Sequence, residues 1–457
     1  SLEGRQAGDR RAGEVAQERL QPRKSLVHPR RIAPVAAGED LERLAGRRHC
    51  LFVDSAARDA ADPLAAPRLG RHSFVAADPI HSLEVFAGGD GSDAARVNEA
   101  FSRLQSLLGD LACTTIPGLP PFQGGVAGLV SYDCGLVRLG LGSSGDGTVP
   151  LLSLHAYDLV FAFDHDAGRG WIISQGVPAR GPTARRARAE ERLESLLSSL
   201  ATPPQAAAAA PESRVEGTIV STQSQASYLD MVRAGIELVR AGDIFQVNLA
   251  QRLSLAAALD PVELYRRSRS LNPAPFAGFF DSGTATIVSM SPERLLHDER
   301  GTVRMHPIKG TRRMLSSPEA DLYAGEDLGQ SEKDRAENVM IVDLVRNDLS
   351  RVCTPESVRV EALCRLERYR YVQHLVSIVA GRLRPGCTPH AAHPAAIPGG
   401  SVTGAPKHRA CEIIAGVEVG LGARQHAAGA LDGVHPHGAP LDVQQPLRRH
   451  AHDRRGA

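Results

Sequence analysis

The sequence predicts an α+β fold with two lobes, in which antiparallel β-sheets form a sandwich core flanked by helices. Three observations lead to this prediction. Segments with strand alternation are followed by segments with helical spacing, without the repeating βαβ pattern of a parallel sheet. A stretch rich in proline and alanine, residues 201–211, divides the chain. The length of 457 residues is enough for two or three average domains or one large two-lobed one.

The composition is that of a globular protein and excludes several classes of partner. The chain is 42% hydrophobic and 23% charged with a net charge of +1, so neither nucleic acid nor an anionic membrane is an expected partner. Aromatic residues make up only 4%, which disfavours a base-stacking surface. No apolar run approaches the ~20 residues that span a bilayer. The seven cysteines are scattered, which indicates reduced thiols in a cytoplasmic protein and argues against disulfides or a zinc site.

The first half is expected to contain a disordered leader, residues 1–24, and a lobe over residues 25–200. The leader is polar, charged and without periodicity. Apolar spacing predicts two helices in the lobe, at 93–111 and 183–200. Apolar segments predict strands at 49–54, 72–77 and 124–132, and segments 151–163 and 170–174 alternate like strands of one sheet.

The second half is expected to contain a linker, residues 201–220, and a catalytic domain, residues 221–414. A helix that starts at Ser224 and ends near Gly242 is followed by a long alternating span, 243–255, which predicts a strand with one buried face. The remaining elements before the predicted site are a helix at 261–271 and strands at 275–280 and 285–289.

The next segment, residues 289–314, predicts a hairpin with an acid and an amine at one mouth. Its extended pieces are Arg294–His297 and Val303–Ile308, joined by a turn at 298–301. Glu293 precedes the first piece and Lys309 ends the second, and a hairpin brings such ends together. Taken alone, the same pattern also fits an ordinary hairpin with surface charges.

A strong helix is predicted at residues 331–352, with Ser331 as its N-cap. Asp334, Glu337 and Asn338 follow at spacings that stack them on one face. Two carboxylates one turn apart can hold a hard cation such as magnesium, which prefers oxygen ligands. The alternative is a solvated face with ordinary ion pairs.

Two later segments also carry chemistry-bearing residue types. His374 lies in an apolar strand, where a histidine is either a hydrogen-bonded core residue or a catalytic one. Residues 397–407 form a glycine-rich loop with two hydroxyls, before a helix from about Pro406. Loop N–H groups and a helix N-terminus suit a carboxylate or a phosphate, but the spacing does not match a nucleotide-binding motif.

Taken together, these segments resemble the chorismate-utilising enzymes, which include anthranilate, aminodeoxychorismate, isochorismate and salicylate synthases. The resemblance covers roughly Leu26 to Ile414. Five segments in the right order carry it: Ser291–Glu293, Pro307–Thr311, Glu332–Glu337, Asp343–Asp348 and Gly399–Lys407.

Within this family, Lys309 selects the branch. Relatives that make anthranilate typically have alanine at this position, and aminodeoxychorismate synthases have lysine. The isochorismate and salicylate branch has a lysine base at the position of Gln246, and a glutamine cannot replace it. The resemblance is therefore closest to the large subunit of aminodeoxychorismate synthase, on the route to p-aminobenzoate and folate. Anthranilate synthase component I remains the nearest alternative.

The resemblance implies a role for each site residue. Glu337, with Asp334 nearby, would hold Mg²⁺ against a chorismate carboxylate, and Glu293 would protonate the departing C4 hydroxyl. Lys309 would attack C2, before ammonia adds at C4 and expels it. His374 would orient the substrate. Its carboxylates would be held by Gly310, Thr311, Ser401, Thr403 and Gly404.

The ammonia is expected to come from solution or from a separate glutamine amidotransferase subunit. The chain shows no cysteine nucleophile elbow with a downstream His-x-Glu, so no glutaminase half is recognised. In relatives the first lobe can also hold tryptophan.

The resemblance ends at Ile414, and residues 415–457 are expected to be an aberrant, disordered tail. This tail has five of the 17 histidines at irregular spacing and no helix or strand period, as after a shifted reading frame or divergence. Strands of the core sheet and a second metal ligand would then be missing. We therefore expect weak or no activity, and a further alternative is an inactive subunit that only binds the amidotransferase.

Overall fold

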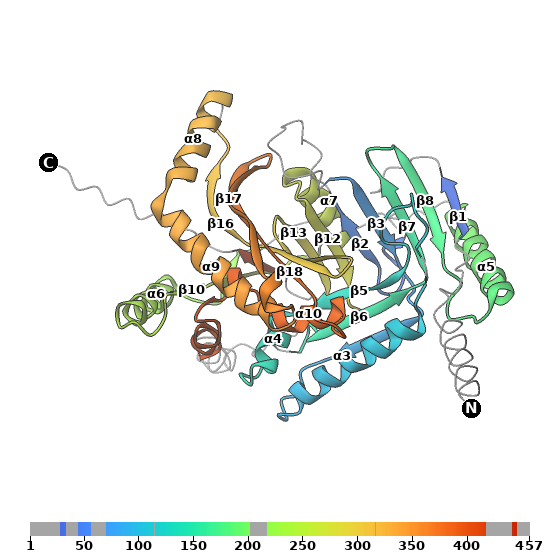
Figure 1. Ribbon diagram of the computed structural model, residues 1–457, viewed down its shortest axis with the longest axis horizontal. Helices are drawn as coiled ribbons and strands as arrows, with labels where there is room; N and C mark the ends of the chain where they lie inside the picture. The colour runs from blue at the N-terminus through green and yellow to red at the C-terminus, as the bar shows by residue number, and fades with distance from the viewer. Residues whose placement is uncertain are drawn as a thin grey trace, which may run out of the picture.

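The chain folds into antiparallel β-sheets with helices on their outer faces, which confirms the predicted α+β class (Figure 1). The computed structural model describes residues 28–32, 44–55, 70–113, 115–143, 145, 147–201, 217–315, 317–416 and 441–445. Within these ranges the strands form a seven-stranded sheet, a five-stranded sheet and three sheets of two or three strands. The predicted leader and most of the predicted linker and tail lie outside the described residues.

The seven-stranded sheet joins the two halves of the chain. Its order is β1-β8-β7-β3-β2-β12-β13. β12 (Phe276–Asp281) comes from the second half and pairs with β2 (Leu51–Asp54) from the first. The sheet therefore contains strands from both sides of the segment 201–220, which the sequence marks as a linker. The other strands are β1 (His28–Ile32), β3 (His72–Ala76), β7 (Leu159–Asp164), β8 (Arg169–Ser174) and β13 (Thr286–Ser291).

A second sheet of the first half has the order β4-β6-β5. Val97 and Leu104 of helix α3 and Val137 of helix α4 pack against it in one buried cluster. Its strands are β4 (His81–Val85), β5 (Gly125–Val130) and β6 (Leu152–Tyr157), and its helices are α3 (Asp93–Asp110) and α4 (Tyr132–Arg138).

The predicted strand at 151–163 is wrong as a single strand. It divides at Asp158 into β6 and β7, which belong to different sheets. Asp158 is fully buried at the bend, where its carboxylate forms an ion pair of 2.9 Å with Arg192. The apolar pattern runs on across the bend because both strands are buried, so the pattern does not reveal the change of sheet.

The five-stranded sheet carries four of the predicted site residues: Lys309, Gly310, Thr311 and His374. β18 (Val372–Arg382) pairs with β15, β16 and β17, and β14 pairs with β15. Val303 and Val379 of the sheet pack against Ile341 and Val345 of helix α9. The other members are β14 (Arg294–Glu299), β15 (Thr302–His306), β16 (Ile308–Arg313) and β17 (Arg359–Arg368), with helices α8 (Pro318–Gln330), α9 (Glu332–Ser350) and α10 (Pro389–Ala396).

The predicted hairpin is confirmed, with one correction. β14 and β15 pair across a turn at Arg300 and Gly301, both with positive φ, as a tight hairpin turn requires. The second strand ends at His306, however, and Pro307 separates it from β16. Lys309 therefore lies in a third strand and not at the end of the hairpin, because proline cannot donate a ladder hydrogen bond.

The predicted long strand at 243–255 is also wrong. It forms two short strands in different sheets, β10 (Gln246–Val247) and β11 (Gln251–Leu255), and the expected buried face is absent from both. β10 pairs with β19 (Gly404–Ala405). β11 pairs with β9 (Val220–Ser221) and with β20 (Leu441–Gln445), a strand in the stretch where the sequence predicts none. A strand can pair with a free strand edge through its backbone alone, so its sequence need not alternate between apolar and polar residues.

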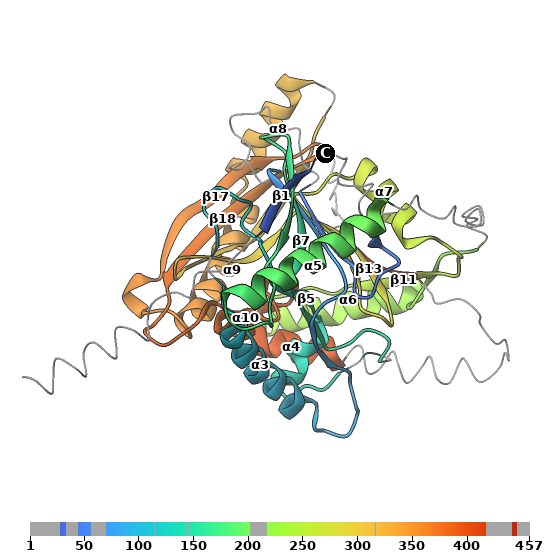
Figure 2. The same cartoon turned by 90° about the vertical axis from the view of Figure 1, so that its right-hand side faces the viewer.

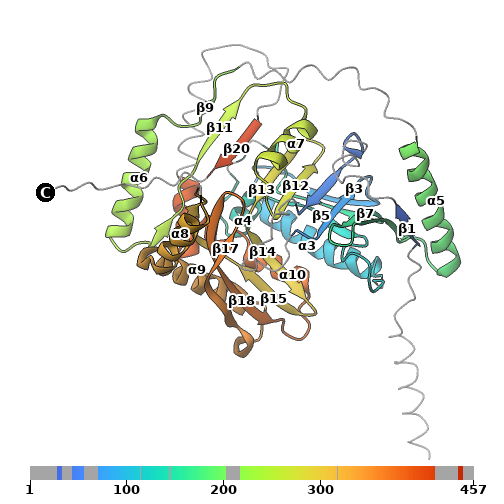
Figure 3. The same cartoon turned by 90° about the horizontal axis from the view of Figure 1, so that it is seen from above.

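Three further helices lie around these sheets. α5 (Pro182–Ala201) packs against β8 and lies across the face of the seven-stranded sheet (Figure 2). α6 (Gln225–Arg240) lies at the opposite end of the molecule from α5 (Figure 3). α7 (Pro261–Leu271) contacts β12 and β13.

The seven cysteines, all within the described residues, are free thiols. No helix among those residues is long and apolar enough to cross a membrane.

Candidate active site

Lys309 is a buried lysine on β16. Its side chain is 6% exposed, because β16 lies between α9 and the neighbouring strand β18. The Nζ atom donates a hydrogen bond of 3.0 Å to the carbonyl oxygen of Ser401. This hydrogen bond joins strand β16 to the glycine-rich loop, although the two residues are 92 positions apart in sequence.

Gly310 and Thr311 continue the strand and connect it to His374. Gly310 has φ +92°, and a Cβ there would lie 3.2 Å from Asp334 Cβ, so this position favours glycine for both conformation and space. Thr311 pairs with His374 across β16 and β18, and Thr311 Oγ1 lies 2.9 Å from His374 Nδ1. The register of the sheet thus sets the position of the His374 imidazole, which is 7% exposed.

The glycine-rich loop turns through a 3-10 helix, Gly400–Val402, and enters β19. Thr403 is fully buried, and its hydroxyl donates a hydrogen bond of 3.0 Å to the carbonyl of Gly399. A Cβ at Gly404 would lie 2.1 Å from the carbonyl oxygen of Gln246, so only glycine allows β10 and β19 to pair here. The Thr403 hydroxyl is thus engaged in holding the loop.

Gln246 and Asn248 form a further wall of the site. The resemblance marks the position of Gln246, whereas no pattern in the sequence indicates Asn248. Asn248 Nδ2 donates a 3.0 Å hydrogen bond to the Ser401 carbonyl, which also accepts from Lys309. Gln246 Nε2 donates to Asn248 Oδ1 at 3.4 Å, and Gln246 Oε1 is buried without a hydrogen-bond partner. An unsatisfied acceptor in this position is available to a bound ligand.

The two predicted metal ligands lie on the first turns of α9. Ser331 caps this helix, as predicted, by accepting from the Asp334 N–H. The Asp334 carboxylate forms an ion pair of 3.2 Å with Arg312. Glu337 lies one turn further, 36% exposed, with its Oε1 3.8 Å from Lys333 Nζ.

Asn338 fixes this helix against the sheet. Its side-chain amide donates to the carbonyls of Lys309 and Leu375 at 3.3 Å, and its oxygen accepts from the Ser377 hydroxyl. The backbone on which Lys309 and His374 depend is therefore held by one buried amide.

A buried ion pair joins α9 to the segment after the loop. Lys407 Nζ lies 2.5 Å from Asp348 Oδ2, with the two side chains 13% and 1% exposed. Burial raises the pKa of Asp348, and the nearby positive charge of Lys407 opposes that rise. Both residues belong to segments that carry the family resemblance, Asp343–Asp348 and Gly399–Lys407. Their pairing depends on the fold and was not predicted.

A second polar group lies beside His374. The Tyr369 ring is 5.4 Å from the His374 ring, and the Tyr369 hydroxyl donates to Glu367 Oε2 at 2.9 Å. Burial raises the pKa of Glu367 and of Tyr369. No spacing signal in the sequence connects these residues to the site.

Glu293 lies in the connection between the two large sheets, after β13 and before β14. Its N–H donates to the Ser291 hydroxyl at 3.2 Å, which fixes the local turn. Since Arg294 pairs with His306, Glu293 is next to the junction of β15 and β16 that leads into Lys309. The hydrogen bonds described above bring Lys309, Ser401, Gln246 and Asn248 together and join Thr311 to His374.

Comparison with known proteins gives consistent results. The profile of the chorismate binding enzyme family matches residues 57–430, beginning after the predicted Leu26 and ending beyond the predicted Ile414. Anthranilate synthase component 1 of Thermus thermophilus is 40% identical over 308 residues, which are 66% of this chain and 64% of that protein. Aminodeoxychorismate synthase component 1 of Salmonella typhimurium is 35% identical over 309 residues, 64% of this chain and 62% of that protein. The chain thus spans less than two thirds of each of these two relatives.

A solved structure agrees with these matches. The crystal structure of anthranilate synthase component I from Streptococcus pneumoniae superposes with a TM-score of 0.64 at 28% sequence identity. The superposition covers 79% of this chain and 80% of that one.

Proposed function

The chain belongs to the chorismate binding enzyme family, and we propose that within this family it aminates chorismate at C4. The proposed reaction is that of aminodeoxychorismate synthase: chorismate and ammonia give 4-amino-4-deoxychorismate and water. The product would serve the synthesis of p-aminobenzoate and folate.

The observation that supports this proposal best is the buried amine of Lys309. It lies in the segment Pro307–Thr311, next to Gly310, whose positive φ favours glycine. Its Nζ atom donates to the Ser401 carbonyl at 3.0 Å. A nucleophilic amine must reach the substrate in its neutral form, with solvent excluded. The 6% exposure of Lys309 meets the second condition.

In the proposed reaction Lys309 Nζ forms a bond to C2 of chorismate while the C4 hydroxyl leaves. Glu293 supplies the proton with which that hydroxyl departs as water. Ammonia then forms the C4–N bond, the double bond moves back, and the C2–Nζ bond breaks, which returns the lysine to its starting state. Atoms and charge balance without an oxidant or a reductant.

The neighbouring residues would bind and orient the substrate. His374, whose ring is positioned by Thr311, would hydrogen-bond to it. We propose that Gly310, Thr311, Ser401, Thr403 and Gly404 form the part of the site that holds its carboxylates, with the Thr403 hydroxyl keeping the loop in shape by its bond to the Gly399 carbonyl.

The carboxylates of Glu337 and Asp334 fit a magnesium ion by the type of their donor atoms, since Mg²⁺ takes oxygen ligands. The exposed contact of Glu337 with Lys333 is weak and replaceable, whereas Asp334 is already engaged with Arg312. We propose Glu337 as the main ligand, with Asp334 nearby. When bound, the ion would neutralise a substrate carboxylate and withdraw electron density from the ring.

The proposed partner is a glutamine amidotransferase subunit that supplies ammonia, and the proposed compartment is the cytoplasm. The seven free thiols support a reducing environment.

The second candidate is anthranilate synthesis, in which ammonia adds at C2 and pyruvate leaves. The 40% identity to the component 1 of Thermus thermophilus favours it. The two reactions differ in the need for a nucleophile, because direct addition of ammonia at C2 leaves no role for Lys309.

The experiment is conversion of chorismate by the purified full chain with Mg²⁺ and an ammonium salt, followed by chromatography of the products. We expect the 4-amino product, and a loss of at least about 10³-fold in its formation for Lys309→Ala. Arg313→Ala, an exposed cation on the same strand, is the matched control and should retain activity. Anthranilate with pyruvate, equally formed by Lys309→Ala, would replace the proposal with the second candidate. No conversion, with an amidotransferase subunit still bound, would favour a non-catalytic subunit.

A further inference from the structure

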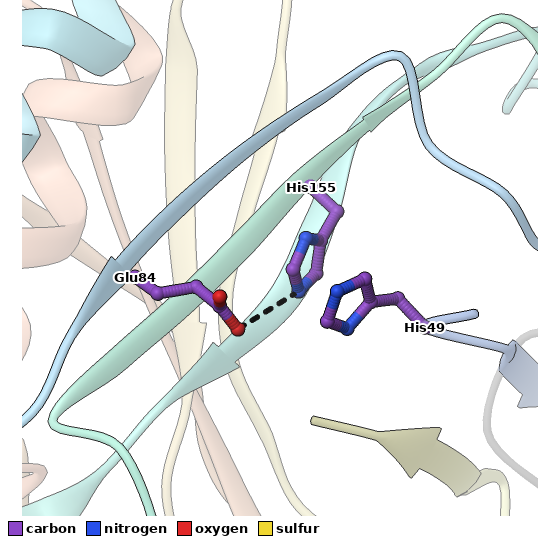
Figure 4. A group of neighbouring side chains, drawn as sticks. All are labelled: His49, Glu84 and His155. Atoms are coloured by element: carbon purple, nitrogen blue, oxygen red, sulfur yellow. Dashed lines mark ion pairs between the residues drawn. The ribbon is translucent and has the colours of Figure 1, made fainter. Parts of the chain in front are cut away.

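A second cluster of chemistry-bearing side chains lies in the first half of the chain, apart from all the residues above. His49 precedes β2, Glu84 lies on β4 and His155 on β6. Each offers one ligand atom, and these three atoms lie within 4.8 Å of one another. Figure 4 shows the two imidazole rings face to face, with the Glu84 carboxylate directed at His155. We propose that these three side chains bind a divalent transition-metal ion of the zinc class.

The donor set suits such an ion, and a rotation of one of the two stacked imidazole rings would let both nitrogens face it. Two imidazole nitrogens and one carboxylate oxygen form a known zinc ligand set, which leaves a fourth position for water. His155 Nε2 and Glu84 Oε1 are 4.0 Å apart, and the edge of a zinc tetrahedron is about 3.3 Å for bonds of about 2.0 Å. A shift of less than about 1 Å closes this gap, and the Glu84 side chain, 31% exposed, can rotate to make it.

His49 provides independent support, because it is a buried polar side chain without a partner. It is 8% exposed, and its Nδ1 atom is buried without a hydrogen bond. Its ring lies 3.9 Å from the His155 ring, with 21° between the planes. Buried nitrogens are nearly always satisfied in folded proteins, so an atom of this kind beside two other donor atoms is suited to bind an ion.

His155 is held in the form that binds metal. Its Nδ1 lies 2.8 Å from the Ser82 hydroxyl oxygen, which can accept a hydrogen bond from Nδ1–H and so leave the Nε2 lone pair facing Glu84. Ser153 Oγ lies 2.8 Å from Nε2 and can turn to Glu84 Oε1 at 3.3 Å when an ion is bound. Burial, assisted by the positive charge of Arg48, lowers the pKa of His155 to about 3, so its imidazole is neutral at pH 7.

The ion would connect two sheets. His49 leads into the seven-stranded sheet, whereas Glu84 and His155 belong to the sheet β4-β6-β5. One ion would therefore tie these sheets together and stabilise the first half. This proposal does not depend on the proposed function, because none of the three residues takes part in it.

The test uses the full chain, stripped with a chelator and titrated with Zn²⁺ or Co²⁺. The variants are Glu84→Gln and His155→Gln, and the control is His81→Gln, which removes an exposed histidine from the same strand as Glu84. Five histidines after residue 416 can also bind metal, so the readout is the difference between each variant and the wild type. Circular dichroism of the metal-free proteins checks folding, and Glu84→Gln, at an exposed side chain, is expected to fold.

We expect the wild type and His81→Gln to show a tetrahedral Co²⁺ absorption band and a zinc-dependent rise in melting temperature. Glu84→Gln and His155→Gln should bind at this site at least about tenfold more weakly and lose both signals. Identical Co²⁺ spectra and identical zinc-dependent melting in all four proteins would overturn the proposal, and the three residues would then be an ordinary hydrogen-bonded cluster. So would a wild type that binds no metal.

Discussion

The two polar clusters of this molecule, one around Lys309 and one around His155, are built in different ways. Around Lys309, the contacts described above include several backbone groups: Lys309 Nζ donates to the Ser401 carbonyl, and Gly404 on β19 pairs closely with β10. Around His155, the partners are side chains from neighbouring strands and a loop. The Lys309 site therefore depends on short segments of particular sequence. The His155 cluster requires only that three side chains distant in sequence come together.

This difference can be tested first at Glu293, where the largest effect is expected. If Glu293 is the general acid, Glu293→Gln should lower the rate of chorismate amination by about 10²–10⁴-fold, because an amide cannot donate the required proton. The rate is measured with ammonium salt and saturating chorismate. Glu299→Gln, an exposed carboxylate at the other end of β14, is the control and should leave the rate unchanged. Equal rates for both variants and the wild type would remove Glu293 from the mechanism.

The next largest effect is expected at the buried ion pair of Asp348 and Lys407, which joins α9 to the segment after the glycine-rich loop. Asp348→Asn leaves Lys407 partly buried without its ion-pair partner, so we expect a loss of about 3–5 kcal/mol in the free energy of unfolding. Urea unfolding measures this loss.

The matched control for that change is Asp343→Asn on the same helix, whose pair with Arg346 is exposed and should contribute less than about 1 kcal/mol. If both variants lose the same amount, the buried pair has no special structural role.

A smaller effect is expected at His155 and depends on pH. The pKa of His155 is about 3 in the folded state, against 6.5 for an ordinary histidine. The unfolded chain therefore binds a proton that the folded chain does not, and stability falls as the pH drops from 6.5 toward 3. The slope is about 1.4 kcal/mol per pH unit for one group.

The measurement is the urea unfolding midpoint at pH 7 and pH 5, with a chelator present to exclude metal. His155→Gln should lose less stability between these values than the wild type does, and His81→Gln should follow the wild type. Parallel losses in all three proteins would show that the His155 imidazole is not held neutral by the fold.

The contrast between the clusters also explains what the sequence could predict. The segments around Lys309 and Ser401 are each contiguous in sequence, so they can be read as motifs, and the resemblance to the family is what connects them to one site. The pairing of Asp348 with Lys407 and the hydrogen bond from Asn248 to the Ser401 carbonyl were not predicted, because they depend on how α9, β10 and β19 meet.

Errors in the predicted fold have similar physical causes. The break at Asp158 was missed because β6 and β7 are both buried, and their apolar pattern continues across the bend. Residues 243–255 alternate like one strand, yet edge pairing with different partners divides them. The cluster of His49, Glu84 and His155 has no spacing signal, since its members come from two sheets.

The shared seven-stranded sheet determines how the chain can be divided. A cut between α5 and β9 would leave β2 with an open edge in the first fragment, and the hairpin β12–β13 would leave with the second. Phe279, which is buried in the common core, would then be exposed. We therefore expect two fragments that are insoluble when expressed separately and that reassemble when expressed together. The two fragments could therefore serve as a split-protein reporter. Their solubility when expressed together would indicate that β2 has paired with β12.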